Sequence, residues 1–207
     1  FSSIVGGCCN FIESTDPNNC CMFQFIGGGS RNCSAKDYSV IVGGILNSSS
    51  AACGFIGSGL GNAVGGANVT HAAVLAGLRN KASGSYSAVI NGICNLVTGT
   101  RSLIGAGTFN TASASCGFIG SGCKNIIGSS NSIVVGGAFN SASAACSAIV
   151  GGFRNTSSGA CSFVGGGSCN YVSGNNNSVV GGTKNTGSAS CNFIGGGLCN
   201  YNNSDCA

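Results

Sequence analysis

Apolar and polar positions follow one pattern that recurs every 15 residues over most of this chain. An asparagine marks each repeat, and a glycine stands three residues before every one of these asparagines. The interval differs at two places, being 22 residues after Asn10 and 18 after Asn62. So strict a period predicts one small structural unit stacked many times. The asparagines are Asn10, Asn32, Asn47, Asn62, Asn80, Asn95, Asn110, Asn125, Asn140, Asn155, Asn170, Asn185 and Asn200.

A single repeat, residues 146–160, shows what the unit is. Its apolar run Ala148–Val150 is short and closed by Gly151 and Gly152, which is typical of a strand that ends in a tight turn. A second short extended piece follows Asn155, before another corner of Ser, Gly and Ala, and this leaves no room for a helix. Stacked repeats place each strand about 4.8 Å from its copy. The pattern predicts an all-β fold, a parallel β-solenoid of about thirteen 15-residue coils with no helices of note.

The side chains that face inward follow from comparing the repeats. The residue six positions before each asparagine is always Ile or Val, which predicts the core. Small or apolar residues such as Val97 and Ile127 stand two positions after the asparagine and are expected to meet the core from the opposite strand. We expect the asparagine to cap a corner, with its amide bonded to the amides above and below. We expect the recurring glycine to have a positive φ or to let the next coil pass close by.

The other side of the first strand is also apolar. The residues seven and five positions before the asparagine trade volume, because Phe is paired with Gly, whereas Ala148 is paired with Val150. A strand surface that faces solvent would not need this complementarity, so we predict a subunit contact. The alternative is that a terminal segment covers this surface or that it tolerates exposure. The phenylalanines concerned are Phe25, Phe55, Phe118, Phe163 and Phe193.

Charge is sparse, at 6% of residues with a net charge of +4. The acids lie near the ends, and none stands between Asp37 and Asp205. Cations immediately before a repeat asparagine would form a thin basic line along one edge, too thin for nucleic acid, which needs clustered cations. No apolar run is long enough for a bilayer span, so we expect no membrane insertion. The cations concerned are Arg31, Arg79, Lys124, Arg154 and Lys184.

The two irregular intervals divide the chain. Residues 1–37 are expected to form an N-terminal cap with irregular first coils, and residues 38–207 the regular solenoid, with a short insertion near 63–71.

Fifteen cysteines indicate an oxidising, extracellular location, either secreted or at the cell surface. Metal binding is the rival interpretation, but there is no CxxC pair and His71 is the only histidine. Cysteines one coil apart at equivalent positions predict two disulfides, Cys146 with Cys161 and Cys191 with Cys206. A further group is expected to staple the N-terminal cap, namely Cys8, Cys9, Cys20 and Cys21.

Six Asn-x-Ser/Thr sequons are candidates for covalent glycans. Three of them use ladder asparagines, which are expected to be engaged at corners. The better candidates lie off the ladder, at Asn68, Asn176 and Asn202.

Nothing in the chain predicts catalysis or a cofactor. A single histidine and acids confined to the ends provide no paired carboxylates and no Ser/His/Asp set. Glycine runs such as Gly165–Gly167 lack the following Lys-Ser/Thr and the helix that a phosphate loop requires. We therefore expect a protein that is not an enzyme.

The repeats Ser147–Asn155 and Ser162–Gly167 resemble the head repeats of trimeric autotransporter adhesins, and related repeats of viral and phage fibre proteins. The resemblance covers almost all of the chain. It implies a left-handed parallel β-roll that packs as trimers through apolar strand faces.

Three functions follow as hypotheses. The first is a structural subunit of a self-assembling extracellular filament, a homopolymer joined head-to-tail through open solenoid ends and stabilised by disulfides. The alternative is a trimeric adhesin or viral fibre domain that binds a receptor or glycan. The last is an ice-binding β-solenoid, for which ranks of Thr-x-Thr are expected, whereas Thr98–Thr100 is nearly the only such triplet.

Overall fold

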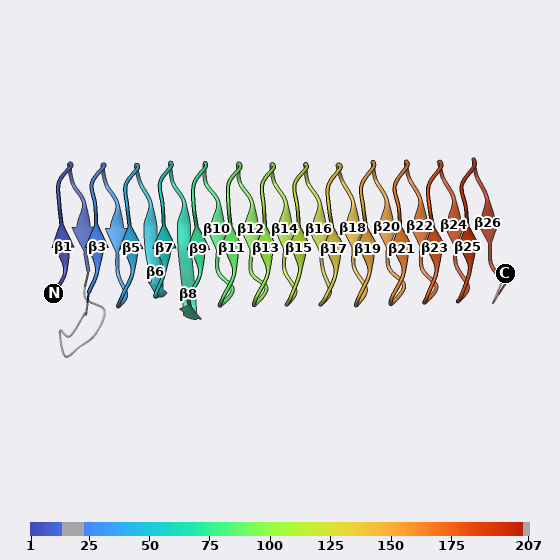
Figure 1. Ribbon diagram of the computed structural model, residues 1–207, viewed down its shortest axis with the longest axis horizontal. Coiled ribbons are helices and arrows are strands. Elements are labelled where there is room, and N and C mark those ends of the chain that lie inside the picture. Colours follow the sequence, from blue (N-terminus) through green and yellow to red (C-terminus); the bar gives the residue numbers. More distant parts are fainter. Residues whose placement is uncertain (14–22, 205–207) are drawn as a thin grey trace. The chain divides into compact units, whose positions relative to one another are not determined.

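The computed structural model describes residues 1–13 and 23–204. It confirms the predicted all-β fold: the chain is a parallel β-solenoid of about 12 turns with a spacing of about 15 residues, since thirteen asparagines bound twelve turns. Each turn contributes one odd-numbered and one even-numbered strand (Figure 1). The chain divides into two compact units, Phe1–Gly107 and Thr108–Ala207.

In the first unit, odd-numbered strands pair only with odd-numbered strands, and even-numbered only with even-numbered, all in parallel. The odd-numbered strands are β1 (Ser3–Ile4), β3 (Phe25–Ile26), β5 (Val40–Ile41), β7 (Phe55–Ile56), β9 (Ala73–Val74), β11 (Ala88–Val89) and β13 (Leu103–Ile104). The even-numbered strands are β2 (Phe11–Ile12), β4 (Cys33–Ser34), β6 (Ser48–Ala52), β8 (Ala63–Thr70), β10 (Lys81–Ala82) and β12 (Leu96–Val97).

The second unit repeats this architecture with two-residue strands. Its odd-numbered strands are β15 (Phe118–Ile119), β17 (Ile133–Val134), β19 (Ala148–Ile149), β21 (Phe163–Val164), β23 (Ser178–Val179) and β25 (Phe193–Ile194). Its even-numbered strands are β14 (Thr111–Ala112), β16 (Ile126–Ile127), β18 (Ser141–Ala142), β20 (Thr156–Ser157), β22 (Tyr171–Val172), β24 (Thr186–Gly187) and β26 (Tyr201–Asn202).

The core is the predicted column of Ile and Val. Ile149 in β19 is fully buried, and its register partner in β21 is Val164, which is also fully buried. The residue two positions after each asparagine meets this column from the even-numbered strand, as Val172 does in β22. Because every turn buries only these few side chains, the stability of each turn depends on its neighbours.

The corner between the two strands of a turn is held by the repeat asparagine. Asn155 is fully buried, and its Nδ2 donates to the carbonyl of Gly151 at 2.9 Å and to that of Gly167, in the next turn, at 3.0 Å. Its Oδ1 accepts the backbone N–H of Asn170 at 3.0 Å. Most bonds of the ladder join side chain to backbone, and the expected bonds between successive side-chain amides occur at some turns, as from Asn95 to Asn80 at 3.2 Å. One side chain thus bonds three backbone groups of the corner, of which the Gly167 carbonyl also accepts the backbone N–H of Phe153 at 2.9 Å.

The positive φ expected of the recurring glycine is confirmed, with values between 83° and 107°. The structure adds left-handed residues that are not glycine. The residue immediately before the asparagine has a positive φ, 54° at Arg154, and so does the residue nine positions before it, 57° at Cys146. The backbone N–H groups of both donate to the preceding turn, to Ala138 and to Ser130 respectively. These bonds hold a conformation that bulky residues seldom adopt.

The insertion near residues 63–71 lengthens two strands. β6 and β8 are longer than the other strands (Figure 1), and their register shifts between Ser50 and Ala52. Gly65 and Asn68 in β8 have positive φ values, which lets the extra residues bulge from the ladder. At the other irregular interval, β1 already pairs with β3, so residues 1–13 belong to the regular register. The residues expected to complete a cap, 14–22, lie outside the described part of the chain.

Candidate assembly interface

The outward side of the odd-numbered strands in the second unit is apolar and exposed. We call it the outer apolar face; it consists of the first residue of each odd-numbered strand and the residue after that strand. Val135 and Val150 are each 46% exposed, and Phe193 is 62% exposed. The face consists of Phe118, Ile133, Ala148, Phe163, Ser178 and Phe193, with Gly120, Val135, Val150, Gly165, Val180 and Gly195.

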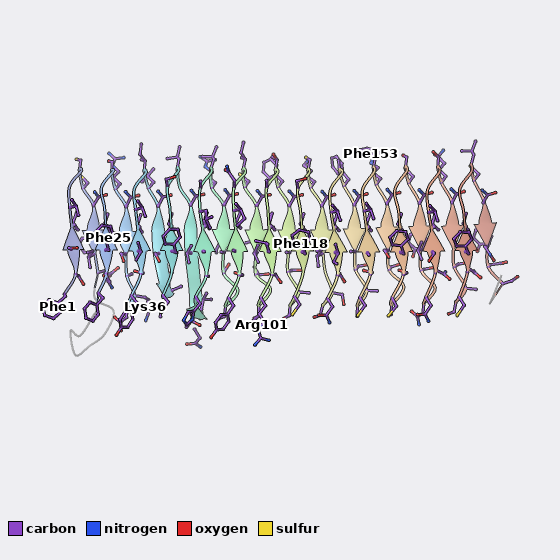
Figure 2. The ribbon with its side chains drawn as sticks, in the orientation of Figure 1. Phe1, Phe25, Lys36, Arg101, Phe118 and Phe153 are labelled. Carbon is purple, nitrogen blue, oxygen red and sulfur yellow. The ribbon has the colours of Figure 1, made fainter. Side chains whose placement is uncertain are left out.

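Large and small side chains pair within several turns of this face, as Phe163 does with Gly165, whereas Ile133 and Val135 are both large. A Cβ on Gly165 would lie 3.3 Å from a ring carbon of Phe163 and 2.4 Å from the carbonyl oxygen of Val180. The ring therefore occupies the space over the glycine, while the neighbouring turns carry a valine there. Figure 2 shows Phe118 lying on the strand face of its turn. Exposed apolar surface of this kind suits packing against another protein surface.

The outward side of the even-numbered strands in the same unit has a different character. Hydroxyl-bearing residues dominate its first strand positions, and Ile126 is the exception, at 47% exposure. The other residues are Thr111, Ser141, Thr156, Tyr171, Thr186 and Tyr201. Only one of the two outward sides of this unit is therefore predominantly apolar, with Ser178 as its one hydroxyl-bearing residue.

The first unit carries the same kind of face on its odd-numbered strands. Phe55 is 37% exposed and Phe25 is half-buried. Val42, Leu75 and Ile90 are exposed at the positions that follow their strands. All five phenylalanines predicted to lie at an interface thus point outward from odd-numbered strands, and three of them are exposed.

The predicted Cys146–Cys161 disulfide is not present in the structure, and both residues are exposed free thiols. Equivalent positions in neighbouring turns are about 4.8 Å apart, which lies within the Cα separations that disulfides span. The register therefore brings the two residues close together, and in the structure both remain thiols. All twelve cysteines of the described residues are free thiols, Cys191 among them. Its predicted partner Cys206 lies outside those residues, as do Cys20 and Cys21.

Local interactions hold two of these thiols in the protonated form. The pKa of Cys8 is raised, mainly by a hydrogen bond with Cys9, whose sulfur lies 3.2 Å away, and further by the negative charge that a Cys9 thiolate would carry. Burial raises the pKa of the Cys33 thiol, with a smaller contribution from the charge of Glu13. Because the thiolate is the reactive form, both residues react more slowly at neutral pH than free cysteine.

The asparagines of the six sequons fall into two groups, those in the ladder and those outside it. The ladder asparagines Asn32, Asn47 and Asn155 are fully buried. Asn68 and Asn176 are exposed, whereas Asn202 is half-buried and its Oδ1 accepts the N–H of Ser204 at 3.2 Å.

After secretion from a eukaryotic host, we expect N-glycans at Asn68 and Asn176, whose side chains lie in solvent, and none at Asn155, whose amide is engaged in three hydrogen bonds. Glycopeptide mass spectrometry before and after enzymatic deglycosylation measures the occupancy of each site. A glycan on Asn155 would show that the ladder forms only after glycosylation, against this expectation.

The remaining sequence candidates give no second site. His71 stacks on Tyr86, with ring centroids 4.9 Å apart and an interplanar angle of 5°. The described residues contain no detected pocket and no group of three or more His, Cys, Asp or Glu that could hold a metal ion. Within residues 1–13 and 23–204, no helix has the length and apolarity to span a bilayer.

Sequence reasoning missed a column of buried polar residues eight positions before the asparagine. Ser162 is buried inside the coil, where its hydroxyl lies 2.5 Å from that of Ser157 and donates to the carbonyl of Gly159 at 2.6 Å. The recurrence of serine eight positions before the asparagine is the sequence signal that could have predicted this column. The members that are serine and buried are Ser39, Ser87, Ser102, Ser132, Ser147 and Ser162.

The fold and its surfaces define this protein as a repetitive parallel β-solenoid with an exposed apolar outer face. No protein-family model matches the chain, and no curated protein matches it significantly.

Proposed function

We propose that this protein is a structural subunit of an extracellular filament, in which copies of the chain assemble through the outer apolar face. The observation that carries this proposal is the face itself, which has no charge and, apart from Ser178, is apolar in every turn of the second unit. Exposed apolar surfaces of this continuity mark sites of protein association.

A second copy of the chain is the partner that fits. Ridges and valleys on the face recur with the spacing of the turns, about 4.8 Å. A partner needs the same spacing for its side chains to interdigitate along the whole face. A second copy has this spacing because it consists of the same turns. The partner must also lack charge, and the contact face of a second copy carries none.

The double variant Val135→Glu/Val150→Glu tests this assembly. The two valines hold equivalent positions in neighbouring turns, and both are exposed, so the variant is expected to fold but to place charge in the contact. We expect the wild-type protein to form filaments in negative-stain electron microscopy and the variant to remain dispersed, with at least a tenfold loss of assembled mass in sedimentation. The same images report whether copies join head-to-tail, as the sequence led us to expect.

The matched control is Ile126→Glu/Ser141→Glu, on neighbouring even-numbered strands of the same unit. Ile126 is 47% exposed, close to the value for the two valines, and the added charge is equal. Assembly that survives in the control supports the proposal. Equal loss in both variants would show that added charge, rather than this face, governs association, and the proposal would then fail.

The same face also supports the fibre-domain hypothesis. The resemblance to adhesin head repeats implies a closed trimer, which also needs an apolar strand face. Sedimentation equilibrium separates the two functions, because a trimer has a fixed mass whereas a filament grows with protein concentration.

A further inference from the structure

Every charged side chain within residues 108–204 occupies one register position. Lys124, Arg154 and Lys184 each stand immediately before a ladder asparagine, and this segment contains no Asp or Glu. All three residues are exposed, with left-handed φ values of 52°, 54° and 55°. They therefore form a straight line of cations along one corner of the turns, two turns apart, which is about 9.6 Å at the spacing of parallel strands.

Aromatic rings hold two of these cations in place. The Nζ of Lys124 lies 5.2 Å from the ring centroid of Phe139, and the guanidinium carbon of Arg154 lies 5.9 Å from the same centroid. Arg154 also lies 5.0 Å from the centroid of Phe153, whose ring meets that of Phe139 edge-on. Since Lys124 belongs to the preceding turn and Arg154 to the following one, a cation approaches Phe139 from each side. Figure 2 shows Phe153 at this corner, away from the strand face that carries Phe118.

We infer that this corner binds an acidic polysaccharide, with its chain lying along the line from Lys124 to Lys184. The cations are spaced regularly, rings order Lys124 and Arg154, and residues 108–204 contain no acid that could neutralise them. A linear polyanion satisfies such a line better than a single small anion, because it reaches successive cations at once. Sulfated and carboxylated polysaccharides carry charge in each disaccharide, a repeat of length comparable to the cation spacing.

Nucleic acid fits this corner less well. Single-stranded DNA and RNA bind by stacking their bases on free aromatic faces, and the ring of Phe139 is already engaged by two cations. Duplex binding draws on many more phosphate contacts than three cations supply. The corner also lies apart from the outer apolar face, so this inference does not depend on the proposed assembly.

Heparin, as a heavily sulfated polysaccharide, is the first probe, and hyaluronan, which carries only carboxylates, is the second. We expect the full chain to bind immobilised heparin and the double variant Lys124→Gln/Arg154→Gln to bind it about tenfold more weakly, with a shallower salt dependence. Binding to both probes would indicate recognition of charge spacing, and binding to heparin alone a site for sulfate. Phe139→Leu retains every charge, so weaker binding by this variant supports the ordering role of the ring.

The matched control is Arg79→Gln. Arg79 holds the same register position in the first unit with a φ of 53°, and no ring contact is found for it. Its loss is expected to change heparin affinity less than twofold. Equal losses in the Arg79 and Arg154 single variants would overturn the inference, because net charge alone would then explain binding. Tighter binding to single-stranded DNA than to heparin at equal salt would overturn it in favour of nucleic acid. Wild-type protein that binds neither polysaccharide would also overturn it.

Discussion

Replacing Gly152 with alanine is expected to destabilise the second unit by about 2–6 kcal/mol. The φ of Gly152 is 89°, a conformation that strains any residue with a Cβ. A Cβ there would lie 2.2 Å from the carbonyl oxygen of Gly167 and 2.6 Å from Nδ2 of Asn155. The turns would have to separate, which would break the bonds that Asn155 and Phe153 donate to that carbonyl.

Gly151→Ala is the matched control, since the same methyl group is added one residue earlier. A Cβ on Gly151 meets nothing within 4 Å, and its φ is not positive. The change is expected to be neutral or to stabilise by up to about 1 kcal/mol, because alanine restricts the unfolded chain. Urea denaturation followed by circular dichroism measures both variants. Similar midpoints for the two would contradict the tight approach of neighbouring turns at Gly152.

These two glycines illustrate which features of the fold can be predicted from the sequence. The 15-residue period and the invariant Ile or Val are sufficient to predict the stack of strands, the inward column that includes Ile149, and the glycine with positive φ. These predictions succeed because the same interaction recurs in every repeat. A position that requires a particular residue therefore shows that residue in all repeats. The trade of volume between Phe163 and Gly165 likewise predicted that the outward side of this strand is apolar.

The corners could not be predicted in the same way. Bulky residues such as Arg154 and Cys146 adopt left-handed conformations because their N–H groups bond to the preceding turn. This is a tertiary interaction that outweighs the local preference of the residue, and the varied side chains at these positions conceal it. The predicted Cys146–Cys161 disulfide is not present in the structure, in which both residues are free thiols. Register brings two cysteines close, but a bridge also requires a particular Cβ–S–S–Cβ geometry, which the period of the sequence does not specify.

The line of cations could be predicted from the sequence, but the ring contacts that hold its side chains in place could not. The position of Lys124 and Arg154 before ladder asparagines follows from the period. Their shared contact with Phe139 depends on side chains from three successive turns meeting at one corner. The sequence predicts only a thin basic edge. The fold adds the aromatic rings that hold Lys124 and Arg154 in place along that edge.

Replacing Asn155 with alanine is expected to destabilise the second unit by about 2–4 kcal/mol. The variant loses two donated bonds and leaves the backbone N–H of Asn170, which is buried, without the Oδ1 that it contacts at 3.0 Å. An unsatisfied buried N–H costs more than the bond itself contributes, because the group has lost its water and gained no partner. Hydrogen exchange at the Asn170 amide and the urea midpoint measure the two consequences, and exchange is expected to rise first at that amide.

Two further variants separate the ladder from the general cost of removing an asparagine. Asn155→Asp keeps an oxygen for the Asn170 N–H but sets a carboxylate against the carbonyls of Gly151 and Gly167, so it is expected to be at least as unstable as the alanine variant at neutral pH. Asn131→Gly removes an exposed side chain whose φ of 58° glycine adopts freely, and a change within about 0.5 kcal/mol is expected. Were Asn155→Asp as stable as the wild type, the two donated bonds would contribute nothing, and the stability of the corner would rest on the accepted bond alone.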